Sequence, residues 1–293
     1  MKPFLESIRE GRILIFDGAM GTQLEERGVH PGPDANLESP ETVMDVHKAY
    51  IDAGADVLIT NTLTANRIAL ERSGESGKIA EYNTAGVEIC RKSAGDKAYV
   101  AGDISSTGQF MEPYGDYTED QFHEVFSEQA KALESAGADL IIIETMTALN
   151  ETVVAMKACK SATSLPVIAS MSFDPGAAGP RTMMGNDVES CVRRLDEAGA
   201  DIIGTNCGGM TPEQMVEVIA VIRGITDKPI IAEPNAGVPE LIEGHARFNL
   251  GPDGFAEGAL KCVKAGAQLI GGCCGTSPAH IAELKKAIAN YKQ

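Results

Sequence analysis

The chain has 293 residues, of which 43% are hydrophobic and 23% are charged, so it is long enough to bury one large core. Its formal net charge of -17 disfavours binding to nucleic acid and to anionic membranes. The first residues carry charges that a signal peptide would lack, and no apolar run reaches membrane-spanning length. We therefore expect a cytoplasmic protein whose partners are small molecules or other proteins.

Eight short apolar runs follow one another along the chain, separated by segments in which apolar residues recur at helical spacing. The runs cover residues 13–16, 57–60, 99–102, 140–143, 167–171, 202–205, 230–232 and 268–271. Continuous apolar runs are typical of strands buried on both faces, and their alternation with helices indicates a parallel sheet. The pattern predicts an α/β protein made of a single (β/α)8 TIM-type barrel, with one domain over residues 1–293.

A tetrapeptide recurs just before several of these runs. Ala-Gly-Ala-Asp stands at 53–56, 136–139 and 198–201, and Ala-Gly-Ala-Gln stands at 265–268. A glycine in this position predicts the end of a helix, after which the next strand begins. Internal duplication and convergent loop chemistry both explain the repeat, and both support the predicted architecture.

The residues that follow the runs are unusually polar. They are Asp17, Asn61, Asp103, Glu144, Asn206, Cys207, Glu233, Asn235, Cys273 and Cys274. Barrel active sites form at the C-terminal ends of the strands, so we expect these side chains to meet at one mouth. The sequence leaves Asp103 and Glu233 open between a role in the site and support of a loop.

Three cysteines follow the sixth and eighth runs, namely Cys207, Cys273 and Cys274. Three thiolates on a tetrahedral zinc ion leave one position open, which is typical of catalysis and not of a structural site. Three buried thiols, or a disulfide between Cys273 and Cys274, are the alternatives. The other four cysteines fall on predicted helices without metal-ligand spacing, and we interpret them as small core residues: Cys90, Cys159, Cys191 and Cys262.

The neighbouring residues point to the kind of substrate. A zinc ion with three thiolates activates water poorly, but it suits a thiol, whose proton it displaces. Asp17 and Glu144 can hold an ammonium group, while the amides from Gly18 to Thr22 can receive a carboxylate if they open a helix. A helix N-cap for Asp17 and a structural role for Glu144 are the alternatives. The favoured substrate is an amino acid that carries a thiol.

Several of these segments together resemble the homocysteine S-methyltransferase family, in particular the homocysteine-binding barrel of cobalamin-dependent methionine synthase. The most specific segments are Glu-Pro-Asn-Ala-Gly at 233–237 and Gly-Gly-Cys-Cys-Gly-Thr at 271–276, together with Cys207. Residues 16–22, 53–62, 102–104, 144–145 and 205–207 add to the likeness. The resemblance covers nearly the whole chain.

The resemblance implies roles for individual residues. The three cysteines would bind zinc and serve catalysis through it, with the homocysteine thiolate as the fourth ligand. Asp17 and Glu144 would contact the substrate amino group, beside the substrate-binding amide of Gly18. Asn235 would approach the metal when substrate is absent, and support of its own loop is the alternative role.

The expected activity is that of a zinc-dependent homocysteine S-methyltransferase, which activates homocysteine as a zinc-bound thiolate and methylates it to methionine. The chain is expected to contain no donor module, so the methyl group would come from outside, and the resemblance to the cobalamin-dependent barrel favours methylcobalamin carried by a corrinoid protein. S-methylmethionine or another sulfonium is the alternative, and the absence of Trp disfavours a betaine pocket. Transfer to another thiol and a non-catalytic zinc-binding module of a corrinoid complex also stay open. The loops at 29–36 and 174–181 follow the first and fifth runs and could act as lids, and the sequence leaves open whether they close over substrate.

Overall fold

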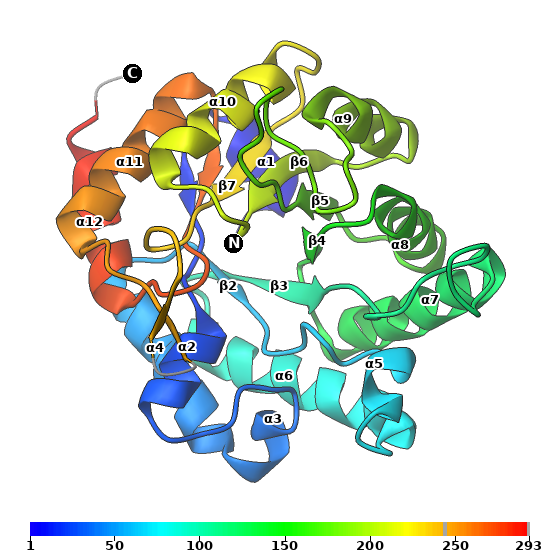
Figure 1. Cartoon of the computed structure of the whole chain (residues 1–293). Coiled ribbons are helices and arrows are strands. Elements are labelled where there is room, and N and C mark those ends of the chain that lie inside the picture. The colour runs from blue at the N-terminus through cyan, green and yellow to red at the C-terminus, as the bar shows by residue number, and fades with distance from the viewer. Residues whose placement is uncertain (243–244, 292–293) are drawn as a thin grey trace.

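The computed structural model describes residues 1–242 and 245–291, and its main sheet is a ring of parallel strands (Figure 1). The strands of the ring are β1 Leu14–Ile15, β2 Val57–Ile59, β3 Tyr99–Ile104, β4 Leu140–Met146, β5 Val167–Met171, β6 Ile202–Asn206, β7 Ile230–Glu233 and β10 Leu269–Ile270. Their order is β1-β10-β7-β6-β5-β4-β3-β2, and a parallel bridge between Phe16 and Val57 joins its two ends. The predicted (β/α)8 barrel is confirmed.

Most of the helices cover the outside of this ring (Figure 1), whereas α1 packs against its interior. The helices are α1 Phe4–Arg9, α2 Met20–Glu26, α3 Ala35–Glu38, α4 Pro40–Ala53, α5 Arg67–Glu71, the 3-10 turn η1 Ser76–Lys78, α6 Ile79–Ala94, α7 Glu119–Ala136, α8 Leu149–Ala162, α9 Val188–Glu197, α10 Pro212–Arg223, α11 Pro252–Ala265 and α12 Pro278–Ala289. Their boundaries follow local chemistry, since Thr118 and Thr211 form capping boxes at the start of α7 and α10.

The repeated tetrapeptide marks the ends of four helices, as predicted. Its glycines Gly54, Gly137, Gly199 and Gly266 all have positive φ, at 99°, 99°, 91° and 121°. A glycine adopts this conformation without the steric cost that a Cβ would add. Each of these glycines therefore ends a helix and directs the chain into the next strand.

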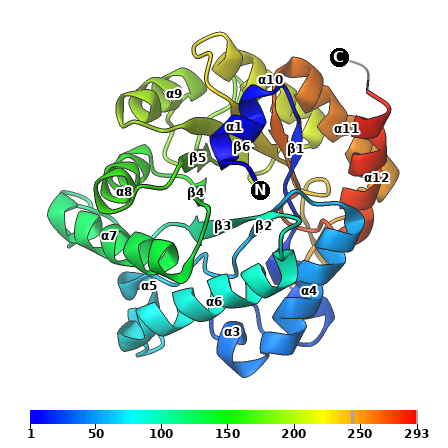
Figure 2. The ribbon, with the colours of Figure 1, turned by 180° about the vertical axis from the view of Figure 1, so that it is seen from behind.

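The interior of the barrel is closed at one end by α1, which lies across the ring in the view from behind (Figure 2). Phe4 and Ile8 of this helix join the interior cluster of buried strand residues, which includes Leu14, Phe16 and Tyr99. The rings of Phe4 and Tyr99 meet edge to face with centroids 5.2 Å apart. Because Tyr99 begins β3, the closed end is the N-terminal end of the strands, and the opposite end forms the mouth.

A second, larger apolar layer lies between the ring and the helices. Strand residues that point outward, such as Ile141 and Ile143, share one buried cluster with Phe122, Phe126 and Leu133 of α7. Burying each such side chain contributes about 1.5–3 kcal/mol relative to leaving it exposed. This layer fixes the strand ends against the helices and holds the mouth in shape.

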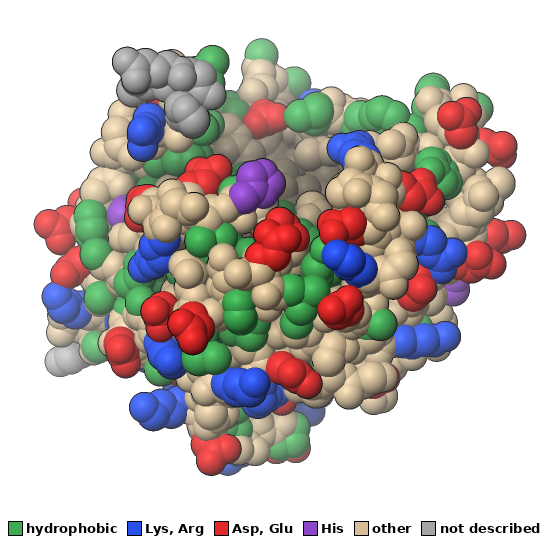
Figure 3. Space-filling model, turned by 90° about the horizontal axis from the view of Figure 1, so that it is seen from below, with side chains coloured by type: hydrophobic (Ala, Val, Ile, Leu, Met, Phe, Trp, Pro, Cys, Tyr) green, Lys and Arg blue, Asp and Glu red, His purple; other side chains and the backbone are tan. Residues whose placement is uncertain are grey.

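The structure departs from the sequence prediction at a few places. β1 and β10 are shorter than predicted, whereas β3 and β4 run on through polar residues. An antiparallel hairpin of β8 Glu240–Ile242 and β9 His245–Arg247 follows β7 and was not predicted. Within the described part of the chain, no helix is both long and apolar enough to cross a membrane. Acidic side chains are scattered over the face drawn in Figure 3, and the surface is hollowed at its upper edge.

Candidate functional site

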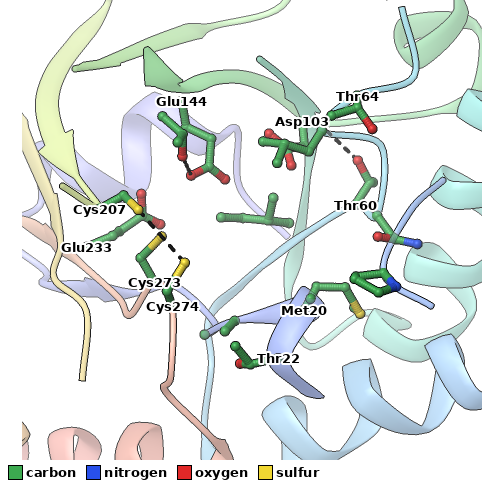
Figure 4. A pocket seen from close by; sticks show the side chains of 18 of the residues that line it. Met20, Thr22, Thr60, Thr64, Asp103, Glu144, Cys207, Glu233, Cys273 and Cys274 are labelled. Atoms are coloured by element: carbon green, nitrogen blue, oxygen red, sulfur yellow. Dashed lines mark hydrogen bonds between the residues drawn. The ribbon is translucent and has the colours of Figure 1, made fainter. Parts of the chain in front are cut away.

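Three thiols meet at the mouth of the barrel, from the ends of β6 and β10. The sulfurs of Cys207, Cys273 and Cys274 all lie within 4.8 Å of one another, and the Cys207 and Cys274 sulfurs are 3.8 Å apart. Figure 4 shows them together on one side of a pocket. None of the chain's cysteines is in a disulfide, which removes the alternative of a Cys273–Cys274 bridge.

Cys207 has a strained backbone conformation at the turn that carries its sulfur into the cluster. Cys207 has φ of 55°, one of two positive values among the described residues other than glycine, and Thr145 has the other at 56°. Non-glycine residues in this region cost about 1–3 kcal/mol and cluster at functional sites. The strain at Cys207 therefore supports a functional role for the turn that follows β6.

The thiol cluster fits a tetrahedral metal. Zinc binds thiolate sulfur at about 2.3 Å, which separates two sulfur ligands by about 3.8 Å. That value matches the Cys207–Cys274 distance of 3.8 Å. Soft sulfur ligands suit zinc and not magnesium or calcium. No fourth Cys, His, Asp or Glu ligand joins this cluster within the described residues, so the donor set leaves one position open.

Hydrogen bonds among the three thiols shift their pKa values. Hydrogen bonds from Cys273 and Cys274 lower the pKa of Cys207 to about 3, and they outweigh the opposing effect of burial. The same contact with Cys207 raises the pKa of Cys274 to about 12. These hydrogen bonds favour the thiolate form at Cys207, and all three sulfurs must lose their protons when they bind a metal.

A pocket of about 280 Å³ opens beside the cysteines. Its lining includes the carboxylates Asp103, Glu144 and Glu233, contributed by three different strands (Figure 4). None of the described residues that line it is a lysine, an arginine or a histidine. The pocket is therefore acidic and has no basic side chain of its own to neutralise it.

Glu144 is held in place by Asn206, a link that the sequence did not reveal. The Asn206 amide Nδ2 donates to Oε2 of Glu144 at 2.6 Å and to Oγ1 of Thr145 at 2.8 Å. It also lies 3.8 Å from the sulfur of Cys273. Burial raises the pKa of Glu144 to about 7, and the Cys207 thiolate adds to the rise. Asn206 thus connects the carboxylate pocket to the thiol cluster.

Asp17 lies beside the pocket but is not among the residues that line it. Its Oδ2 accepts a hydrogen bond from the Ile59 amide at 3.0 Å, which ties β1 to β2, while Oδ1 has no partner among the described residues. Burial raises the pKa of Asp17 well above its ordinary value, although the Ile59 hydrogen bond opposes the rise. The alternative of a helix N-cap is wrong, because α2 begins after Ala19 and has no side-chain cap.

Gly18 lines the pocket at a point of close backbone approach. A Cβ on Gly18 would lie 2.6 Å from Oγ1 of Thr276 and 2.9 Å from the hydroxyl of Tyr50. Thr276 accepts a hydrogen bond from the Ala19 amide at 3.0 Å, so this amide is not available to a ligand. The amides that remain for a ligand carboxylate are those of the first turn of α2, where the Thr22 hydroxyl also has no partner among the described residues.

Asn235 lies next to the thiols. Its Nδ2 donates to the carbonyl of Gly208 at 2.8 Å, and its buried Oδ1 has no partner among the described residues. A hydrogen bond from Asn235 is one of the smaller causes that lower the pKa of Cys207. Asn235 therefore links the loop after β7 to the turn after β6, and its approach to a metal stays a prediction.

The two candidate lid loops differ in their placement. Pro31, Gly32 and Pro33 of the first loop form a wall of the pocket. The second loop is bridged to itself between Asp174 and Arg181, and none of its residues lines the pocket. Its Asp174 accepts a hydrogen bond from the Gly209 amide at 2.7 Å, so it braces the turn that carries Cys207.

A (β/α)8 barrel with three converging thiols and an acidic pocket at its mouth is typical of a barrel enzyme, and the thiols form a cluster that could hold a metal ion. Residues 14–288 match the family model described as homocysteine S-methyltransferase. The chain belongs to this family of methyltransferases.

Individual relatives agree with this assignment. The chain is 29% identical to methionine synthase of Mycobacterium tuberculosis (strain ATCC 25618 / H37Rv) and 28% identical to that of Mycobacterium leprae (strain TN), over 96% and 97% of its length. It spans 25% of the length of each of these curated relatives. The metallated form of the homocysteine methyltransferase MmuM from Escherichia coli superimposes with a TM-score of 0.79 at 25% identity, covering 97% of this chain and 99% of that one.

Proposed function

We propose that the protein transfers a methyl group to the thiol of homocysteine, giving methionine, and that it does so as one barrel domain. The observation that carries this proposal is the convergence of three thiols at an acidic pocket whose described lining residues include no basic side chain. Family membership supports homocysteine as the acceptor.

Cys207, Cys273 and Cys274 would hold a zinc ion, and the metallated MmuM structure supports a metal in this barrel. When bound, such a zinc ion lowers the pKa of an acceptor thiol while the thiolate ligands keep that sulfur nucleophilic. The chain itself contributes the fixed positions of the three sulfurs, through the strained turn at Cys207 and the hydrogen bond from Asn206.

The polar side chains of the mouth orient the acceptor. Glu144 faces the pocket and can bind the acceptor ammonium, with Asp17 behind it at the junction of β1 and β2. The first turn of α2 and the Thr22 hydroxyl can bind the carboxylate, because their donors have no partners within the helix. These contacts would hold the sulfur of homocysteine toward the cysteines and the incoming methyl group.

The transfer forms one bond and breaks another. The sulfur of the acceptor attacks the methyl carbon, the bond from this carbon to the donor breaks, and its electron pair leaves with the donor. The thiol proton is released to solvent when the acceptor binds. Holding the sulfur in line with the methyl group replaces a bimolecular encounter by an oriented one.

For the donor we propose a methyl-corrinoid protein, because the resemblance is to the homocysteine-binding barrel of methionine synthases. A pocket of about 280 Å³ suits a small acceptor, so the macrocycle would have to sit over the mouth. S-methylmethionine is the second candidate, since MmuM matches this chain over 99% of its own length and is a homocysteine methyltransferase without further domains in that structure.

The test supplies zinc-loaded protein and homocysteine with a methylated corrinoid protein, with free methylcobalamin or with S-methylmethionine. Methionine is quantified by mass spectrometry. Methionine formed with any donor supports the proposed acceptor chemistry, and methionine formed only with the sulfonium overturns the corrinoid proposal. Absence of methionine with every donor, from protein that contains one zinc ion, would refute methyl transfer to homocysteine.

A further inference from the structure

We propose that Asn36 and Asn61 are positioning residues: their paired amide groups fix one wall of the acceptor pocket, so that the pocket selects acceptors by length. This selectivity rests on the proposed function, since it concerns the thiol that the same pocket would bind. The wall belongs to the first candidate lid loop, at 29–36, and its contacts make it a fixed part of the barrel.

The wall lies across the pocket from the thiols. It combines residues of the first loop with residues that follow β2: Pro31, Gly32, Pro33, Asn61, Leu63 and Thr64. Figure 4 shows Thr60 and Thr64 on the side of the pocket opposite to the three cysteines. An acceptor whose sulfur lies at the cysteines therefore extends toward this wall.

The side chains of Asn36 and Asn61 bind each other in both directions. Nδ2 of Asn36 donates to the carbonyl of Asn61 at 2.8 Å, and Nδ2 of Asn61 donates to Oδ1 of Asn36 at 3.1 Å. Nδ2 of Asn61 also donates to the carbonyl of Gly32 at 2.7 Å, and Nδ2 of Asn36 donates to that of Tyr82 at 3.3 Å. An asparagine amide has two N–H donors, so both side chains use every donor they have. The pair thus joins the wall to the segment after β2 and to α6.

The pair is held from behind by the backbone of α6. Asn36 is 2% exposed, and a Cβ on Gly86 of this helix would lie 2.9 Å from Nδ2 of Asn36 and 2.6 Å from Cγ2 of Thr62. Only glycine permits so close an approach. Because the pair is closely packed and fully bonded, removing one member leaves buried polar groups of the other without partners.

The segment after β2 is itself tied to the ring. The hydroxyls of Thr60 and Thr62, on either side of Asn61, lie 2.7 Å apart. The Thr60 hydroxyl accepts a hydrogen bond from the Asp103 amide at 3.0 Å, and the Thr62 hydroxyl donates to the Asp103 carbonyl at 2.8 Å. The wall is therefore connected through Asn61 to β3, and we assign this loop a fixed position in place of a lid movement.

A fixed wall limits the length of the acceptor. Homocysteine must place its sulfur at the cysteines while its chain ends before the wall. One additional methylene group in an apolar pocket changes kcat/KM by about 10–200-fold when the walls do not yield. A loosened wall would admit the longer acceptor more easily and would orient homocysteine less well.

The experiment compares two acceptors in three zinc-loaded variants. Homocysteine is compared with 2-amino-5-sulfanylpentanoate, which has the same three functional groups and one more methylene group. Asn36→Ala and Asn61→Ala break the pair, and Asn61 is only half-buried, so its variant keeps the test if Asn36→Ala does not fold.

Glu151→Ala is the matched control. Glu151 is 4% exposed and braces a different loop, since its carboxylate accepts hydrogen bonds from Ser106 and Thr107 at 2.8–2.9 Å. Neither Ser106 nor Thr107 lines the acceptor pocket. Binding is measured by calorimetry and methylation by kcat and KM. Zinc content, thermal unfolding and hydrogen exchange of the 29–38 peptide are recorded for each protein.

We expect the unaltered protein to prefer homocysteine by about 10–200-fold in kcat/KM, and each Asn variant to narrow this preference by about 10-fold. The KM for homocysteine should rise about 3–10-fold while kcat stays within about 3-fold, because the thiols are untouched. The amides of Ala35 and Asn36, which donate to the carbonyls of Gly32 and Pro33, should exchange faster. Glu151→Ala should lower the midpoint of thermal unfolding and leave both the preference and the exchange of this peptide unchanged.

An unchanged preference in folded Asn61→Ala, or an equal narrowing in Glu151→Ala, would overturn the assignment. The proposed function fails separately, when the unaltered protein methylates neither thiol. In that event the calorimetric comparison of the two thiols still decides whether the Asn36–Asn61 pair sets the length of the pocket.

Discussion

Replacing Cys207 by alanine removes one of the three sulfurs. The substitution leaves the conformational cost of the positive φ of 55° nearly unchanged, because cysteine and alanine are both disfavoured there. Structural zinc sites with four protein ligands bind with about 10–16 kcal/mol, so one ligand contributes about 3 kcal/mol. The sulfur of Cys207 is 3.8 Å from that of Cys274, which is the separation a shared zinc ion requires. The substitution should therefore weaken zinc binding by about 100-fold to 1,000-fold.

The assay is competition for zinc with a chromophoric chelator, followed by methyl transfer at saturating metal. Cys191→Ala is the matched control, because Cys191 is 1% exposed on α9 and is not part of the thiol cluster. This control should lower the free energy of unfolding by about 1 kcal/mol through lost packing and leave zinc affinity unchanged. Cys207→Ala protein that binds zinc within about threefold of the unaltered protein and retains full methyl transfer would refute the reasoning.

Three further predictions follow from the described contacts. Asn206→Ala should weaken zinc binding by about 10-fold to 100-fold and raise the KM for homocysteine, because it releases Glu144; unchanged values for both in the chelator and kinetic assays would contradict the role of Asn206. In the metal-free protein, the pKa of Glu144 is raised from 4.5 to about 7, so the folded state holds a proton that the unfolded chain has lost and stability falls as pH rises through this window. Between pH 4.5 and pH 8, the free energy of unfolding measured with denaturant should fall by about 3 kcal/mol more in the unaltered protein than in Glu144→Gln. Parallel pH profiles of the two proteins would contradict the raised pKa of Glu144. Gly18→Ala should lower the free energy of unfolding by about 1–3 kcal/mol, because its Cβ would lie 2.6 Å from Thr276 Oγ1, whereas Gly77→Ala, with nothing within 4 Å, should change little.

The barrel could be predicted from the sequence because its strands are buried on both faces and stand out as apolar runs. Each of the eight predicted runs overlaps one strand of the ring. The C-terminal ends of the strands were harder to predict where they contain polar residues. The apolar run of β4 ends at Ile143, whereas the strand continues through Glu144 to Met146. The hairpin of β8 and β9 was missed because its strands are short and partly charged, so they lack an apolar run.

The convergence of the cysteines was predictable, because the topology brings the ends of β6, β7 and β10 together at one mouth. The burial of Asp103 and Glu233, with carboxylate oxygens that have no partner among the described residues, was not predictable, since spacing along a strand does not tell which oxygens find donors. The contribution of Asn206 was likewise hidden, because its partners Glu144 and Cys273 are distant in sequence and meet only in the folded barrel.

The central claim is that the three cysteines leave one metal position for the thiol of the acceptor. X-ray absorption at the zinc edge counts the sulfur ligands of zinc-loaded protein before and after homocysteine is added. The account predicts three sulfur ligands without homocysteine and four with it, all at about 2.3 Å. Any other number of sulfur ligands in the free protein, or a number that homocysteine leaves unchanged, would contradict it.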